Sequence, residues 1–161
     1  MHSRTLNWLL AFVCHELLVA AYYFQYVEGL QPCPLCIVQR LAVFLIGVFA
    51  LLLAVTNVKP ATLLNRIFNG LGLASAVLGI IAAGRQVWLQ SLPKDEVPAC
   101  GPSLDYMMEV FSTSEVLSEL FKGSGACAEV EWTLLGLSMG AWMLVFFSVT
   151  ALFFLWRLFR K

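Results

Sequence analysis

Charged residues are scarce in this chain. Only 12% of its 161 residues are Asp, Glu, Lys or Arg, whereas 60% are hydrophobic. This balance excludes an ordinary soluble globule of that length and makes a lipid bilayer the expected solvent. The formal net charge is +0, so the overall charge indicates no nucleic-acid partner, and we expect none.

Histidine is also rare, because only His2 and His15 occur. No axial haem pair is therefore available, and no glycine-rich dinucleotide fingerprint follows a strand. If the protein carries electrons, the acceptor must come from outside the chain.

Long apolar stretches are what the chain has in abundance. A helix needs about 20 apolar residues to cross roughly 30 Å of hydrocarbon, and four stretches are long enough. They cover residues 6–27, 41–58, 67–89 and 132–156. The first lacks a small-residue cleavage site before Tyr22, so we expect a retained helix and not a signal peptide. The sequence predicts an all-α integral membrane protein: one membrane domain (1–161), a four-transmembrane-helix bundle with loops at 28–40 and 90–131.

Parity and charge predict the topology. With four crossings, the loops at 28–40 and 90–131 lie on the same side of the membrane. The short segments on the other side carry basic residues and no acid: Arg4, Lys59, Arg66, Arg157, Arg160 and Lys161. The positive-inside rule makes that side cytoplasmic. We therefore expect both termini in the cytoplasm and the two loops on the outer face, which is the periplasmic face of a bacterial inner membrane.

The long loop is predicted to contain two short amphipathic helices. One is indicated by the helical spacing of Leu104, Met107, Met108 and Phe111. The second begins at Ser112, with Glu115 completing a capping box, and ends at Lys122 before Gly123. Such helices can pack on the bundle or lie in the membrane interface, and the sequence leaves both open.

Four cysteines lie in the two outer loops. Cys33 and Cys36 form a Cys-x-x-Cys pair, whereas 26 residues separate Cys100 from Cys127. Zinc sites use spacings of two to four residues, so we expect no metal. A disulfide between Cys100 and Cys127 could simply staple the loop, and outside the cytosol such bonds persist.

The surroundings of Cys36 favour a redox role. It is expected at the N-terminus of the second helix, where backbone N–H groups stabilise a thiolate, and Arg40 follows one turn later. Cys33, in the loop, is expected to lack that help and to be the more accessible partner for exchange. Arg40 could equally extend to the lipid headgroups.

A lipid-soluble quinone is the natural acceptor at the mouth of a membrane bundle. Arg40 and Arg85 are the candidate polar groups for its ring oxygens, although Arg85 could instead mark the membrane boundary. Cys14, inside the first helix, is interpreted as a small hydrophobic residue. Glu16 is interpreted as a structural residue that forms a hydrogen bond to a neighbouring helix or to His15, with a functional role as the alternative.

Together these residues resemble the DsbB family of disulfide-bond formation proteins over nearly the whole chain. The resemblance is carried by the residues of five segments: Glu16 and Phe24-Gln25; Pro32-Cys33-Pro34-Leu35-Cys36 with Arg40; Arg85; Gly125-Ala126-Cys127-Ala128-Glu129; and Trp132, Leu135-Gly136-Leu137, Met139 and Trp142.

The resemblance implies a relay of two redox-active disulfides, Cys33–Cys36 and Cys100–Cys127. A DsbA-like periplasmic thiol oxidase would attack Cys100, Cys127 would exchange with Cys33, and Cys36 would pass electrons to ubiquinone or menaquinone near Arg40. A histidine is expected after the arginine that matches Arg85, but this chain has Gln86, which can offer a hydrogen bond and no titrating group.

Two other functions stay open at this stage. The first is a non-enzymatic membrane assembly or interaction protein whose loop is stapled by Cys100 and Cys127. The second is an enzyme that runs the electrons outward and reduces periplasmic disulfides, because direction depends on the potentials of partner and quinone.

Overall fold

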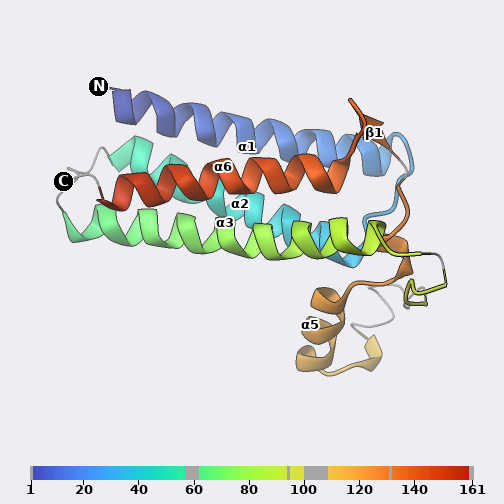
Figure 1. Cartoon of the computed structure of the whole chain (residues 1–161). Coiled ribbons are helices and arrows are strands. Elements are labelled where there is room, and N and C mark those ends of the chain that lie inside the picture. Colours follow the sequence, from blue (N-terminus) through green and yellow to red (C-terminus); the bar gives the residue numbers. More distant parts are fainter. Residues whose placement is uncertain (1, 57–61, 94, 100–108, 131, 160–161) are drawn as a thin grey trace.

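The computed structural model describes residues 2–56, 62–93, 95–99, 109–130 and 132–159. Four long helices dominate this part of the chain and lie side by side (Figure 1). They are α1 (His2–Tyr26), α2 (Pro34–Thr56), α3 (Leu63–Gln90) and α6 (Met139–Phe159). Each is long and apolar enough to cross a bilayer. The predicted all-α architecture with four membrane helices is confirmed.

The order of packing follows from which helices touch. α3 packs between α2 and α6, and α1 packs on α2. The connections between α1 and α2 and between α3 and α6 leave the bundle at the same end (Figure 1). This end brings the two cysteine-bearing loops together, as the parity argument requires.

The α2 helix begins at Pro34, earlier than the expected residue 41. Proline is well suited to the first helical position because the missing N–H would have no partner there. The Sγ atom of Cys33 accepts a hydrogen bond from the backbone N–H of Cys36 at 3.3 Å and so caps the helix. The polar residues Gln39 and Arg40 belong to this first part of the helix because they bind neighbouring helices.

The α6 helix begins at Met139, later than the expected residue 132. The preceding residues form a small antiparallel hairpin of β1 (Thr133–Leu134) and β2 (Leu137–Ser138). Its turn places Leu135 and Gly136 at positive φ, 54° and 79°. The chain is not helical here because two consecutive left-handed residues, Leu135 and Gly136, reverse its direction.

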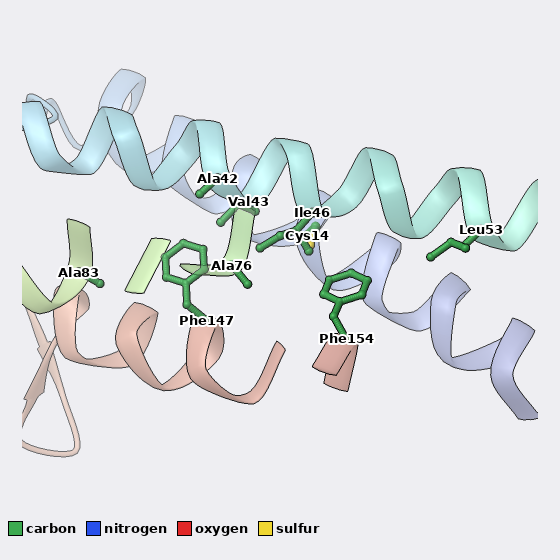
Figure 2. Close-up of a cluster of buried hydrophobic side chains, with 9 residues drawn as sticks. All are labelled: Cys14, Ala42, Val43, Ile46, Leu53, Ala76, Ala83, Phe147 and Phe154. Atoms are coloured by element: carbon green, nitrogen blue, oxygen red, sulfur yellow. The ribbon is translucent and has the colours of Figure 1, made fainter. Parts of the chain in front are cut away.

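The interior of the bundle is closed by small residues facing aromatic rings. A Cβ added at Gly79 would lie 2.3 Å from the Phe147 ring, and one at Gly72 would lie 2.5 Å from the Phe154 ring. The small residues of α3 therefore let α6 approach closely. Cys14 is 1% exposed and belongs to the same apolar cluster as Ile46 (Figure 2).

The loop helix α5 (Thr113–Lys122) has the bounds that its capping signals predict. Glu115 Oε2 accepts hydrogen bonds from the backbone N–H of Ser112 at 2.9 Å and from its hydroxyl at 2.8 Å. Gly123 ends the helix at φ 72°. Leu120 and Phe121 pack against the buried cluster at the cysteine-bearing end, so this part of α5 lies on the bundle. The other predicted loop helix falls largely on residues 100–108, outside the described residues.

Candidate thiol site at one end of the bundle

Three cysteine sulfurs meet where α2 begins. The Sγ atoms of Cys33 and Cys36 are 2.7 Å apart, and the thiol of Cys127 is hydrogen-bonded to that of Cys33. All three are thiols in this structure. Cys33 is 8% exposed and Cys127 has no exposed area, whereas Cys36 is half-buried. The cluster joins a residue of the first loop to a residue of the second. Cys100 lies outside the described residues.

A short 3-10 turn, η1 (Gly125–Cys127), places Cys127 in the cluster. The backbone N–H of Cys127 donates to the carbonyl of Ser124 at 2.8 Å. Just before the turn, Gly123 fits between two leucines, and an added Cβ would lie 2.9 Å from the side chains of Leu35 and Leu89. Its positive φ and its tight surroundings both require glycine. The turn is therefore seated directly on the first turn of α2.

Hydrogen bonding shifts the pKa values of Cys33 and Cys127 in opposite directions. The hydrogen bond with Cys33 lowers the pKa of Cys127 from 9.0 to about 6, and N–H groups of Leu35 and Ser124 add to this against the opposing effect of burial. The pKa of Cys33 is raised far above its ordinary range, first by the hydrogen bond to Cys127 and then by the one to Cys36, with burial adding to both. In the reduced cluster Cys33 therefore holds the proton more tightly, and Cys127 is the more acidic of the two thiols.

Two buried glutamines extend from Cys36 into the bundle. Gln86 of α3 donates from Nε2 to Cys36 Sγ at 3.6 Å, and Gln39 of α2 donates from Nε2 to Gln86 Oε1 at 2.7 Å. Their side chains are 6% and 4% exposed. On α6, a Cβ at Gly140 would lie 3.0 Å from the Gln86 carboxamide, so this glycine leaves room for it. Cys36 thus has a fixed amide donor on its side of the cluster.

Arg40 is directed to α1. Its guanidinium donates to the side-chain oxygen of Gln25 and, at 3.0 Å, to the carbonyl of Ala21. The guanidinium carbon lies 5.4 Å from the centre of the Tyr22 ring. These contacts hold the end of α1 against α2 and place a half-buried positive charge between the two helices.

Arg85 binds the loop helix. Its Nε donates to the carbonyl of Lys122, the last residue of α5, at 3.2 Å, and its guanidinium carbon lies 4.2 Å from the centre of the Trp88 ring. A cation at the C-terminus of a helix satisfies a free carbonyl and opposes the negative end of the helix dipole. Arg85 therefore fixes α5 to α3.

Comparison with known proteins decides the family. The family described as "Disulfide bond formation protein DsbB" matches residues 3–157. This chain belongs to the DsbB family. It is 46% identical over 161 residues to Disulfide bond formation protein B of Marinobacter nauticus, covering 100% of this chain and 95% of that one. The protein of the same name from Methylococcus capsulatus is 48% identical over 140 residues, covering 86% of this chain and 84% of that one.

In this DsbB-family chain the structure changes the sequence-based view of Cys33. The sequence predicts that helix N–H groups help Cys36 and that Cys33 lacks such help. Instead, the N–H of Cys36 donates to Cys33, because Cys33 is the capping residue and its side chain folds back over the first turn. Cys33 is also buried and is not the more accessible sulfur, since η1 and α5 cover it.

Sequence reasoning on the DsbB-family chain also missed Gln39. It lies three residues after Cys36, so the two share one face of α2. That spacing, together with a polar side chain in a buried helix, is a signal that could have found it.

Proposed function

We propose that this protein is a membrane thiol oxidase that reoxidises a DsbA-like periplasmic dithiol protein and delivers the electrons to membrane quinone. The observation that carries the proposal is the contact between Cys127 and the Cys33–Cys36 pair. Disulfide exchange needs a thiolate in contact with a sulfur of the bond that it attacks. A loop cysteine that served only as a staple would have no reason to lie against a Cys-x-x-Cys pair. The family and the four membrane helices support the same function.

The first exchange takes place in the long loop. A thiolate of the partner attacks Cys100 in a Cys100–Cys127 disulfide; a bond forms between the partner and Cys100, and Cys127 leaves as a thiolate. Hydrogen bonds from the backbone of Leu35 and Ser124, which favour the anion of Cys127, would stabilise it as the leaving group. The second thiolate of the partner then displaces Cys100 and completes the disulfide of the partner.

The second exchange joins the two cysteine pairs. The Cys127 thiolate attacks Cys33 in a Cys33–Cys36 disulfide; a Cys33–Cys127 bond forms and Cys36 leaves as a thiolate. Cys100, released by the partner, attacks Cys127 and restores the loop disulfide, which leaves Cys33 and Cys36 as a dithiol. In sum, two electrons and two protons pass from the partner to the Cys33–Cys36 pair.

The residues around Cys36 fit a quinone acceptor. The two ring oxygens of such a molecule need hydrogen-bond donors, and its ring needs an apolar or aromatic neighbour. Arg40, one turn after Cys36, supplies a half-buried cation beside the ring of Tyr22, and the Gln86 amide supplies a donor at the sulfur. These residues would hold the quinone, which when bound supplies an acceptor for two electrons and two protons. Arg85 is assigned instead to the position of α5.

The proposed orientation places the cysteine-bearing end on the periplasmic face of a bacterial inner membrane and both termini in the cytoplasm. It is supported by the basic residues of the opposite end, of which Arg4 donates to the carbonyl of Ala54 at 3.0 Å. Thiols on the periplasmic face are able to form lasting disulfides, which a relay requires.

The test is quinone reduction by the whole protein. Purified protein in lipid nanodiscs is mixed with a reduced periplasmic dithiol protein and ubiquinone or menaquinone, and quinone absorbance is followed. Cys36→Ser and Cys100→Ser are each expected to abolish turnover, while Cys14→Ala, a cysteine of the packed interior, retains it. Normal turnover in either serine variant would exclude the proposal.

The same assay separates the other two functions. If quinol instead drives reduction of an oxidised partner, the protein is a reductase. With a reduced partner whose second cysteine is replaced by serine, we expect a trapped disulfide between the partner and Cys100 of the parent protein, because the partner has no second thiolate to displace Cys100. A stapled, non-enzymatic protein gives neither turnover nor a trapped disulfide.

A further inference from the structure

The amide group of Gln86 lies beside Cys36, and its orientation depends on a residue that does not touch Cys36. A glutamine side chain offers both a donor and an acceptor, and rotation by half a turn exchanges them. In this structure Gln86 presents its NH₂ to Cys36 Sγ and its oxygen to Gln39. A donor stabilises a thiolate, whereas the amide oxygen in the same place would stabilise the protonated thiol. The direction of the Gln86 amide therefore bears on the charge of Cys36.

Gln39 supplies the contact that fixes this direction. Its NH₂ donates to Gln86 Oε1 at 2.7 Å, a normal hydrogen-bond length, and both side chains are almost fully buried. Because both side chains are buried, an amide oxygen that lost this donor would be left unsatisfied. Turning Gln86 around would set its NH₂ against the NH₂ of Gln39. The present orientation is the one that Gln39 favours.

Gly140 of α6 also lies against the Gln86 carboxamide. A Cβ there would lie 3.0 Å from both Cδ and Oε1 of Gln86, so the carboxamide fills the space that this glycine leaves. Two neighbouring helices thus act on the same group, one through a hydrogen bond and the other through shape.

We propose that Gln39 is a positioning residue that holds the Gln86 amide with its NH₂ toward Cys36 and thereby stabilises the Cys36 thiolate. Gln39 acts through Gln86 and does not touch the sulfur. The charged and titratable groups that face Cys36 from the described residues are the thiols of Cys33 and Cys127. Arg40, on the same helix, is directed to α1. The Gln39–Gln86 amide pair, which carries no charge, is thus the group that favours the Cys36 thiolate on the side of Cys36 that faces the bundle.

The inference rests on the proposed function only for the part that Cys36 plays in turnover. It is therefore tested without turnover. The full chain, reduced and free of quinone in nanodiscs, is alkylated with iodoacetamide from pH 5 to 10, and the rate at Cys36 is resolved from that at Cys33 by fragmentation mass spectrometry.

We expect Gln39→Met to slow alkylation of Cys36 at pH 7 by about tenfold, the effect of losing one hydrogen bond to a charged group. At pH 10 the rates of the variant and the parent converge, because the thiol ionises in both. Gln90→Met is the matched control, since Gln90 lies one turn after Gln86 and binds Ser138 at 2.7 Å. It leaves the Cys36 profile unchanged. A merely structural role for Gln39 would alter the rate equally at every pH.

The double variant decides whether Gln39 acts through Gln86. Gln86→Met alone is expected to slow alkylation of Cys36 as much as Gln39→Met does. Adding Gln39→Met to Gln86→Met should slow the alkylation no further. Additive slowing, or an unchanged pH profile in Gln39→Met, would overturn the proposal. Should Gln39→Met fail to fold, Gly140→Ala, which displaces the Gln86 carboxamide, is expected to give the same change in profile, and an unchanged profile there would also overturn it. Loss of quinone turnover with these profiles intact would count against the proposed function alone.

Discussion

Cys127 and Cys33 share one proton across the contact between the two loops. Cys33 donates it, so the pKa of Cys33 is raised and that of Cys127 is lowered to about 6. In the reduced cluster the buried sulfur of the long loop is therefore the more acidic of the two. The titration of Cys127 in the reduced protein therefore depends on Cys33.

The Cβ chemical shift of Cys127 in the reduced protein is expected to titrate with a midpoint near pH 6, with the thiolate above it and the thiol below. Cys33→Ala removes the largest cause of the lowered pKa, so the midpoint moves up toward 9.0. Carbon NMR of labelled cysteine measures both. Cys14→Ala should leave the midpoint in place, and an unchanged midpoint in Cys33→Ala would show that Cys33 is not the donor.

Packing of α3 against α6 makes a prediction about two glycines. In Gly79→Ala the new Cβ meets the Phe147 ring at 2.3 Å, and we expect a loss of about 1–3 kcal/mol in the free energy of unfolding. Gly84, on the same helix, has nothing within 4 Å of an added Cβ. Gly84→Ala is therefore the control and should not destabilise. Denaturant unfolding in detergent measures both, and equal losses would contradict the packing argument.

The contact between Arg40 and α1 predicts that Gln25 matters through Arg40. Gln25→Met removes an acceptor of the guanidinium and is expected to lower the free energy of unfolding by about 1–3 kcal/mol. Combining it with Arg40→Met should add little to Arg40→Met alone, because the two residues form one unit.

Tyr23→Phe provides the control for this pair. It removes an exposed hydrogen bond to Glu28, which follows the end of the same helix, and should have a small effect. Additive losses for Gln25 and Arg40 in denaturant unfolding would mean that the two side chains act separately.

The cap of α5 predicts a pH dependence. Hydrogen bonds from the backbone and hydroxyl of Ser112 hold the pKa of Glu115 below its ordinary value of 4.5. Because the pKa is lowered on folding, stabilisation by the carboxylate is complete above 4.5 and is lost as pH falls through the lower folded value. The amide proton shift of Ser112 should follow this titration.

Glu115→Ala tests the same cap at neutral pH. Hydrogen exchange is expected to accelerate across α5 and to stay unchanged in the four long helices. Glu109→Ala makes the same chemical change outside the cap and should leave α5 protected. Equal protection of α5 in the two variants would contradict the capping role.

The sequence predicts well those features that depend on local chemistry. Apolar length alone finds the four long helices, and Ser112 with Glu115 finds the start of α5. It predicts less well where a helix begins among polar residues. The membrane-spanning stretch is expected only from residue 41 and so leaves out Gln39 and Arg40, because their partners, Gln86 and Gln25, lie on other helices. The hairpin before α6 was missed since a leucine at positive φ leaves no sign in an apolar stretch.

For the site, the sequence identifies the four cysteines as candidates, but it cannot decide which sulfur caps the N-terminus of α2. Capping of α2 by Cys33 depends on how its side chain turns, and burial of Cys33 depends on a turn that is remote in sequence. The direction of Arg40 and Arg85 likewise follows from acceptors that only the fold brings near.

The burial of Cys127 and Cys33 limits the access of dissolved thiols to their sulfur atoms. With no exposed area at Cys127 and 8% at Cys33, a small thiol dissolved in the surrounding water meets almost no surface of either residue, so a path to either sulfur must open first. A sulfur of the same chain needs no path, because it is already in contact. The η1 turn therefore shields the contact between the two loops, so that Cys127 and Cys33 would exchange with each other before they exchange with thiols of the surrounding solution.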